Sequence, residues 1–233
     1  MACLVLASRA DPVLTALQKY TINGKVPVLC MTFDDAGFKD SSPEGNDGTP
    51  AGGVAATTGL SSGAMRFDND WITSPSPSGL PIGNEARTIS FWAKETTTGS
   101  YRGVVSYGSN TSHGRFDILI KDGDDIYIGL NGRYAYTTTD VVSLNEWNFI
   151  TVTYDGTLWN TTALRIYVNG EAQTKTMSSS AELTTGSAYL FIGSEWNNAF
   201  RWIGSIDEVL IYNKSLSSSE VEIIYNIGKA GVR

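Results

Sequence analysis

Three stretches of the sequence place aromatic side chains next to amides or charges, which is chemistry suited to recognising sugars. Trp196, Asn197 and Arg201 share one stretch, Trp159 lies in a second and Tyr134 in a third. An aromatic ring can stack on the apolar face of a sugar, while amide and guanidinium groups hydrogen-bond its hydroxyls. We predict these five residues as ligand-binding. The alternative is that the rings cover loop cores, since tryptophan is highly buried on average.

The acids of the sequence do not suggest catalysis. A retaining glycosidase needs two carboxyl groups about 5 to 5.5 Å apart, and two acids of one strand share a face only when they alternate. No expected strand carries such a pair, and Asp207 and Glu208 are adjacent, so they point to opposite faces. The single histidine, His113, offers no nucleophile–base constellation. We therefore predict that the chain is not an enzyme.

Composition narrows the class of partner. The 233 residues carry a net charge of −7 and no run of lysine or arginine, which argues against nucleic acid and anionic membranes as partners. No apolar run reaches about 18 residues, so membrane insertion is not expected. Met1–Ala10 lacks the basic start of a secretion signal, so no cleaved signal peptide is recognised. Cys3 and Cys30 either form one bridge or stay free, and both options remain open.

Most of the chain alternates between apolar and polar residues, which predicts strands. About a dozen such segments are separated by turns rich in Gly, Asn, Asp and Ser, and no strand–helix–strand alternation occurs. Half-buried strand faces need an opposing layer, so two packed antiparallel sheets are expected. The expected strands include 28–33, 64–72, 88–94, 104–107, 115–121, 125–130, 147–154, 164–168, 188–193 and 203–212.

The two ends of the chain carry helix and turn signals. Asp11 followed by Pro12 predicts the start of a short helix, and Asn23-Gly24 predicts a tight hairpin. Residues 1–26 therefore form an expected N-terminal arm, ahead of a sandwich domain at 27–233. The arm either packs on the domain edge or anchors the chain to a larger assembly. Ser217 and Glu220 form a capping box that predicts a short C-terminal helix.

Six segments, in order, resemble one family. They are Phe33–Asp35 with Asp40–Thr49, Met65–Ile72, Thr88–Ala93, Trp147–Gly156, Leu164–Gly170 and Trp202–Val221. Together they resemble the laminin-G-like domains of the concanavalin A-like lectin/glucanase superfamily, over roughly residues 28–226. The resemblance implies an all-β, antiparallel two-sheet jelly-roll sandwich with a short N-terminal extension and a short C-terminal helix.

The same resemblance implies a metal site. Related domains hold a structural Ca²⁺ with the aspartate that matches Asp207 and with ligands from the opening segments, so Asp34, Asp40 and Asn46 are the other candidate ligands. Ca²⁺ takes six to eight oxygen ligands, which acid-rich turns can supply. The alternative is that Asp40 and Asn46 hydrogen-bond within their own turns.

These expectations favour a non-catalytic carbohydrate-binding or adhesion module of a surface or virion-associated protein, with a glycan or cell-surface polysaccharide as its partner. Two alternatives remain open. One is a structural decoration or fibre protein of a bacteriophage or virus particle, anchored to other subunits through residues 1–26. The other is a glycoside hydrolase of the same fold. The expected location is the extracellular surface or a virion.

Overall fold

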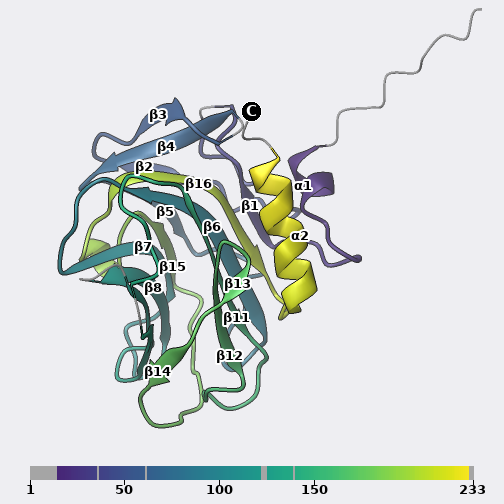
Figure 1. The fold of residues 1–233 in the computed structure, drawn as a ribbon, viewed down its shortest axis with the longest axis vertical. Coiled ribbons are helices and arrows are strands. Elements are labelled where there is room, and N and C mark those ends of the chain that lie inside the picture. The colour runs from purple at the N-terminus through teal and green to yellow at the C-terminus, as the bar shows by residue number, and fades with distance from the viewer. Residues whose placement is uncertain (1–14, 36, 61, 122–124, 139, 231–233) are drawn as a thin grey trace, which may run out of the picture.

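Two antiparallel sheets lie face to face, with helix α2 against the outside of one of them (Figure 1). The computed structural model describes residues 15–35, 37–60, 62–121, 125–138 and 140–230. The predicted all-β sandwich with a short C-terminal helix is confirmed. The regular alternation of the sequence produces this arrangement, because each strand presents one apolar face to the opposite sheet.

The first sheet has the strand order β13-β12-β11-β6-β16-β4-β3, and β1 pairs with β16. Its strands are β13 Glu171–Ala172, β12 Leu164–Val168, β11 Asn148–Tyr154, β6 Arg87–Glu95, β16 Ile203–Tyr212, β4 Gly63–Asp68, β3 Ala55–Thr58 and β1 Leu29–Met31.

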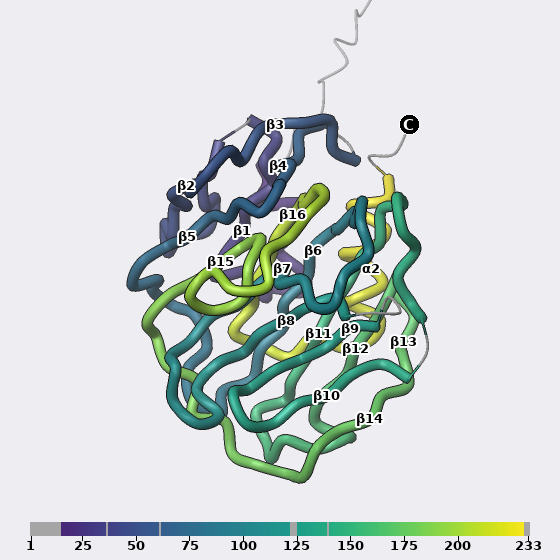
Figure 2. Tube along the Cα trace, turned by 90° about the vertical axis from the view of Figure 1, so that its left-hand side faces the viewer, coloured from purple at the N-terminus to yellow at the C-terminus, as the bar shows by residue number. Residues whose placement is uncertain are grey.

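The second sheet has the order β14-β10-β9-β8-β7-β15-β5-β2. Its strands are β14 Lys175–Met177, β10 Tyr134–Thr137, β9 Asp125–Gly129, β8 Arg115–Lys121, β7 Tyr101–Gly108, β15 Tyr189–Ile192, β5 Trp71–Pro75 and β2 Thr49–Ala51. Figure 2 shows this sheet from its outer side, with β10, β9, β8 and β7 running side by side.

The main core fills the space between the sheets. On β8, Phe116, Ile118 and Ile120 point inward and are at most 2% exposed. On β6, Ile89, Phe91 and Ala93 are fully buried in the same cluster. The intervening residues of each strand must then face outward, so the sequence alternation also decides which side chains the outer faces display.

A second apolar cluster lies outside the first sheet, under the two ends of the chain. Helix α1, Ala16–Lys19, is followed by the Asn23-Gly24 hairpin, and α2 spans Ser218–Lys229. Tyr20 and Ile22 are buried together with Trp92, Val221 and Ile224, among others. The described part of the N-terminal arm, residues 15–26, is therefore packed onto its own domain.

The chain-end signals are confirmed where the structure describes them. Asn23 and Gly24 have φ of 50° and 76°, as a type I′ turn requires, and Ser217 and Glu220 form the predicted capping box of α2. Asp11, Pro12 and Cys3 lie outside the described residues. The described helix α1 begins after the N-cap Thr15.

One predicted strand is corrected. Residues 64–72 were expected to form a single strand, but they form β4 and β5, which belong to different sheets. Asn69 between them has φ of 63°, a left-handed conformation that asparagine tolerates and that turns the chain. Met65 and Ile72 therefore both reach the core, one from each side of the sandwich.

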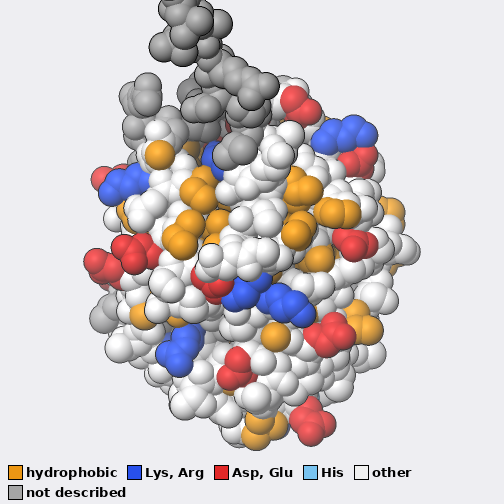
Figure 3. Space-filling model, turned by 90° about the vertical axis from the view of Figure 1, so that its right-hand side faces the viewer, with side chains coloured by type: hydrophobic (Ala, Val, Ile, Leu, Met, Phe, Trp, Pro, Cys, Tyr) orange, Lys and Arg blue, Asp and Glu red, His pale blue; other side chains and the backbone are white. Residues whose placement is uncertain are grey.

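The described helices are short, and the face that carries α2 has mixed charges. No helix in the described part of the chain has the length and apolar character needed to span a bilayer. The side of the molecule that carries α2 shows acidic and basic side chains interspersed, with hydrophobic atoms in small separate areas (Figure 3). Cys30 is buried and has no disulfide partner within the described ranges, and burial raises the pKa of its thiol to about 12.

Candidate functional site

The outer face of the second sheet carries a cluster of one arginine and two acids. Arg115 and Asp117 alternate on β8 with the core residues Phe116 and Ile118, so both point outward. The Arg115 Nε lies 3.3 Å from Asp117 Oδ2, and its Nη2 lies 3.4 Å from Glu195 Oε1. The three side chains are between 1% and 15% exposed. One guanidinium group therefore holds two nearly buried carboxylates.

A glycine allows Glu195 to reach this cluster. Glu195 follows β15, and β7 lies between β15 and β8 in the sheet. A Cβ at Gly103 of β7 would collide with the Glu195 backbone nitrogen, so the absence of a side chain lets the 195–200 segment pass close over the strand. The Gly103 N–H also donates to the Phe200 carbonyl at 2.5 Å. The local packing of β7 thus places Glu195 beside Arg115.

The two oxygens of the Asp117 carboxylate have different surroundings. Its cross-strand partner Ser106 donates a hydrogen bond to Oδ1, whereas Oδ2 has no hydrogen-bond partner among the described residues. Burial raises the pKa of Asp117 to about 7, although Arg115 and Ser106 lower it, and Glu195 adds to the rise. Burial likewise raises the pKa of Glu195, while Arg115 lowers it. The cluster therefore combines one guanidinium group with two carboxyl groups whose pKa values burial raises.

Four tyrosine rings continue from this cluster across three strands. Tyr101 and Tyr127 meet edge to face at 5.3 Å between ring centroids. Tyr127 stacks with Tyr134 at 5.8 Å, and Tyr134 with Tyr136 at 6.1 Å. The Tyr134 side chain is 42% exposed. We call these four residues the tyrosine row. It provides rigid aromatic surface that a ligand can cover with little loss of side-chain entropy.

A pocket of about 350 Å³ lies beside the tyrosine row. Its lining includes Arg115, Asp117, Tyr127, Tyr134 and Glu195. Gly129 of β9 is the direct cross-strand partner of Asp117, and it has no side chain to cover that carboxylate. Aromatic walls with a few convergent polar groups are typical of small-molecule sites.

Four of the five predicted ligand residues lie at or near this face. Tyr134 lines the pocket. Trp196 is half-buried in the short helix η1, Trp196–Asn198, and its ring lies 6.0 Å from the Arg115 guanidinium carbon. Asn197 is exposed on η1. Arg201 is exposed and lies 4.7 Å from the Trp71 ring centroid, further along the same sheet.

The prediction for Trp159 is wrong. Its side chain is fully buried, and its ring lies 6.4 Å from that of Phe116 and 6.3 Å from that of Tyr154. Trp159 also forms an isolated β-bridge with Ala181, which fixes its loop over the core. Its ring faces therefore contact other core residues and cannot reach a sugar.

The acid–arginine cluster was missed because the sequence analysis compared acids within one strand. Asp117 and Glu195 come from different elements and meet only after β8, β7 and β15 are aligned. The expectation that no single strand carries a pair of acids is not affected, because these two acids come from separate segments. The available signal was Asp117 itself, a lone acid between Phe116 and Ile118 in an otherwise apolar strand.

Two of the four predicted calcium ligands are engaged elsewhere. The Asp40 carboxylate accepts the backbone N–H groups of Cys30, Ser42 and Asn46 and the Ser42 hydroxyl. The Asn46 amide hydrogen-bonds the backbone of Ser78 in both directions. These contacts hold the 40–46 loop together, so the metal-ligand prediction for Asp40 and Asn46 is corrected.

Asp34 and Asp207 are the other two predicted ligands. Asp207 is 2% exposed; its Oδ2 accepts the Leu60 N–H at 3.2 Å, whereas Oδ1 has no partner among the described residues. Burial, then Glu208 and Asp34, raise the pKa of Asp207 to about 8. Across the described residues, no group of three or more His, Cys, Asp or Glu is placed to hold a metal. A calcium ion here would need backbone oxygens as well.

The comparisons with known proteins agree with this architecture. Residues 67–222 match the family model described as the concanavalin A-like lectin/glucanases superfamily. The BEACH domain-containing protein B of Arabidopsis thaliana is 29% identical over an alignment of 143 residues. The match covers 54% of this chain. The chain spans only 6% of the length of that relative.

Solved structures share the fold at low sequence identity. Domain 4 of AbnA, an extracellular arabinanase from Geobacillus stearothermophilus solved with arabinotriose, has a TM-score of 0.68 and 18% identity over 84% of this chain and 96% of that one. The binding domain of Paraclostridial Mosquitocidal Protein 1 has a TM-score of 0.64 and 19% identity over 90% of this chain and 53% of that one. The receptor binding domain of botulinum neurotoxin D has a TM-score of 0.62 and 18% identity over 86% of this chain and 52% of that one.

Proposed function

Because the chain belongs to the concanavalin A-like lectin/glucanase superfamily, we propose that it is a non-catalytic carbohydrate-binding or adhesion module of an extracellular surface or virion protein. Its ligand site is the pocket beside the tyrosine row. The observation that carries the proposal is the exposed Tyr134 ring in one pocket with Arg115, Asp117 and Glu195. A sugar ring would cover the tyrosine while its hydroxyl groups hydrogen-bond these charged side chains.

The structural relatives support a saccharide as ligand. The arabinanase domain was solved with arabinotriose, and the superposition covers 96% of that domain. The fold alone does not choose a ligand, because one fold hosts many functions. The aromatic and acidic lining of this particular pocket is what favours a neutral glycan for this chain.

The tyrosine row should dominate glycan affinity. After a glycan array identifies a binder, Tyr134→Ala should weaken its binding at least about tenfold, because the variant loses the exposed ring that the sugar covers. Isothermal titration calorimetry measures the effect. The matched control is Tyr189→Ala, since Tyr189 is 45% exposed on β15 and does not line the pocket. No binder on the array, or equal losses in both variants, would contradict the proposal.

Hydrolysis of a glycosidic bond is a second candidate. It is favoured by the acid pair Asp117 and Glu195 in one pocket and by the pKa of about 7 for Asp117, which suits a general acid. Against it stands Arg115, which contacts both carboxylates and would neutralise a base or nucleophile. Release of new reducing ends from the bound glycan, lost in Asp117→Asn, would establish hydrolysis and refute a purely binding role.

The anchoring alternative has less support. Tyr20 and Ile22 of the arm are buried against the domain, and Lys25 Nζ lies 2.5 Å from a Glu220 carboxylate oxygen of α2. Residues 15–26 therefore make their contacts within the chain, which leaves little of this segment to dock onto another subunit.

We further propose that Ca²⁺ binds at Asp34 and Asp207. Adding Ca²⁺ to EDTA-treated protein should raise the melting temperature by several degrees, because an ion that binds only the folded state stabilises it. Asp207→Asn should abolish this shift, whereas Asp40→Asn should retain it at a lower starting temperature. The absence of both a calorimetric Ca²⁺ signal and a thermal shift in the wild type would exclude the site.

A further inference from the structure

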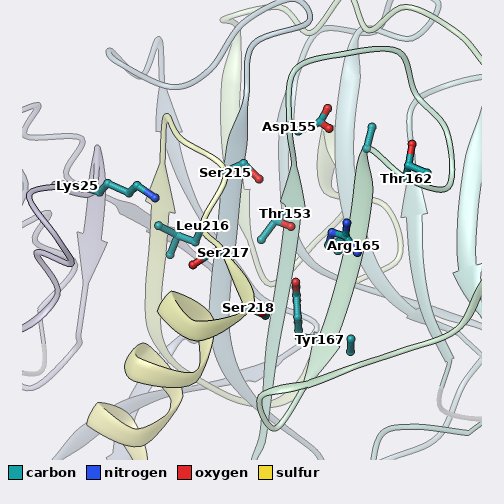
Figure 4. Close-up of a pocket in the computed structure, with 12 residues that line it drawn as sticks. Lys25, Thr153, Asp155, Thr162, Arg165, Tyr167, Ser215, Leu216, Ser217 and Ser218 are labelled. Atoms are coloured by element: carbon teal, nitrogen blue, oxygen red, sulfur yellow. The ribbon is translucent and has the colours of Figure 1, made fainter.

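A second pocket lies outside the first sheet, on the opposite side of the sandwich from the tyrosine row. It has a volume of about 670 Å³ and lies between strands β11 and β12 and the start of α2 (Figure 4). Its lining includes Thr153, Arg165, Tyr167, Ser217 and Ser218. The proposed glycan site shares none of these residues, so an inference drawn here stands independently of that proposal.

The floor of this pocket contains two hydroxyl groups to which the described residues give no hydrogen-bond partner. They belong to Thr153 and Tyr167, which are 1% and 2% exposed. The Tyr167 hydroxyl points up the sheet toward Thr153 and Arg165 (Figure 4). Both hydroxyls line the open pocket, so they can donate to a polar ligand or to water there.

Sheet register places a cation over these hydroxyls. Arg165 is the direct cross-strand partner of Thr153, and it alternates with Tyr167 on β12, so all three side chains share the outer face. Directly opposite residues have Cβ atoms roughly 4.5 to 5.5 Å apart. Arg165 is exposed and makes no ion pair within the described part of the chain. Burial, and to a smaller extent the Arg165 charge, lowers the pKa of Lys175, so a second positive charge lies near Arg165.

The acids around the pocket are already engaged. The Asp155 carboxylate accepts the Thr157 N–H and hydroxyl at 2.9 and 2.6 Å. The Glu220 carboxylate contacts Lys25 and caps the helix at the Ser217 N–H. Neither acid pairs with Arg165, so the guanidinium charge at the centre of the pocket is not compensated by a direct contact.

The start of α2 adds further donors. The helix has 12 residues, and its first backbone N–H groups, at Ser218 and Ser219, have no intrahelical acceptor. The aligned peptide dipoles give this end a partial positive charge that favours anions. Burial raises the pKa of Tyr167, which keeps its hydroxyl protonated and able to donate at neutral pH. Guanidinium, hydroxyl and N–H donors thus converge on one space.

We infer that this pocket binds an oxyanion, such as a phosphate or sulfate group, through the Arg165 guanidinium, the Tyr167 and Thr153 hydroxyls and the N-terminus of α2. The tyrosine and threonine hydroxyls then gain the acceptor they lack, and the arginine gains a counter-charge. A free oxyanion and one carried by a sugar share the same recognition chemistry.

The test uses the full chain and inorganic phosphate at low ionic strength, measured by isothermal titration calorimetry. The wild type should bind, and Arg165→Gln and Tyr167→Phe should each weaken binding about tenfold, as expected for a hydrogen bond to a charged group. The matched controls are Arg66→Gln and Tyr189→Phe, since Arg66 and Tyr189 are exposed elsewhere and should leave the affinity unchanged. Melting temperatures confirm that each variant folds.

Two further arms separate the sources and the artefacts. Glucose 6-phosphate binding more tightly than inorganic phosphate would identify a sugar-borne anion, whereas equal affinities would identify the free anion. If chloride at equal ionic strength gives the same calorimetric signal as phosphate, the signal reflects charge screening only, and the inference is overturned. Phosphate binding that is absent in the wild type, or equal in Arg165→Gln and Arg66→Gln, would overturn it as well.

Discussion

Replacing Arg115 with methionine should lower the free energy of unfolding by about 3 kcal/mol near pH 8 and by clearly less near pH 5. Arg115 is the cation that contacts both Asp117 and Glu195, and the two acids are 1% and 13% exposed. Its removal leaves two nearly buried carboxylates without a counter-charge. The cost is largest where both acids are ionised.

The pH dependence follows from the pKa of Asp117. An unfolded aspartate titrates near pH 4, whereas burial raises the folded-state pKa of Asp117 to about 7. The folded state therefore holds this proton more tightly, so the stability from this group is complete below about pH 4 and is lost as the pH rises through 7. Arg115 lowers this pKa. Without it the pKa rises further, and the loss of stability extends above pH 7.

Urea unfolding between pH 4 and 9 measures this effect. In a background that carries Asp117→Asn, Arg115→Met should cost much less free energy of unfolding, because the amide does not titrate. Arg66→Met is the matched control, since Arg66 is exposed on β4. Asp207, whose pKa is about 8, titrates in every variant and cancels in the comparison. A destabilisation of Arg115→Met that is independent of pH would show that its packing, not its charge, matters.

Replacing Arg87 with methionine should destabilise the fold by about 4 kcal/mol. Arg87 is fully buried. Its guanidinium donates to the hydroxyls of Tyr107 and Thr185 at 2.8 and 2.9 Å and to the carbonyls of Gly83 and Glu85 at 2.8 Å each. Methionine has no donor, so all four acceptors would lose this partner, and the Tyr107 and Thr185 side chains would remain buried.

Differential scanning calorimetry should show a fall in melting temperature on the order of 10 °C for this variant. Arg87→Lys is the informative companion, because it keeps the charge but not the planar group that reaches several acceptors at once. The melting temperature of Arg87→Lys should lie between those of the wild type and Arg87→Met. If Arg87→Lys matches the wild type, the charge alone suffices and the proposed role of the guanidinium geometry is wrong.

Much of the fold could be predicted because its signals are local. The alternation in 115–121 and 148–154 decides which side chains enter the core, and the Ser217 and Glu220 capping box defines the start of α2. The split at Asn69 was not predicted, because apolar residues continue on both sides of it. Only the pairing of β4 and β5 with different sheets reveals that the chain turns there.

The candidate site could be predicted only in part. Tyr134 was identified because an aromatic residue in a polar stretch is a visible feature of the sequence. Trp159 has the same surroundings in the sequence but is fully buried. Composition around a residue does not determine its exposure, because a loop that folds back, as the bridge between Trp159 and Ala181 does, can cover a core.

The sequence by itself determined the secondary structure, the two-layer architecture and the family, because period-two alternation, turn residues and capping residues act over a few neighbouring positions. The tertiary structure alone decided that Arg115, Asp117 and Glu195 meet, and that Arg165 and Tyr167 lie beside the start of α2. These groupings depend on strand order, on register and on the close passage over Gly103. Such long-range geometry follows from packing the whole chain, and no local pattern encodes it.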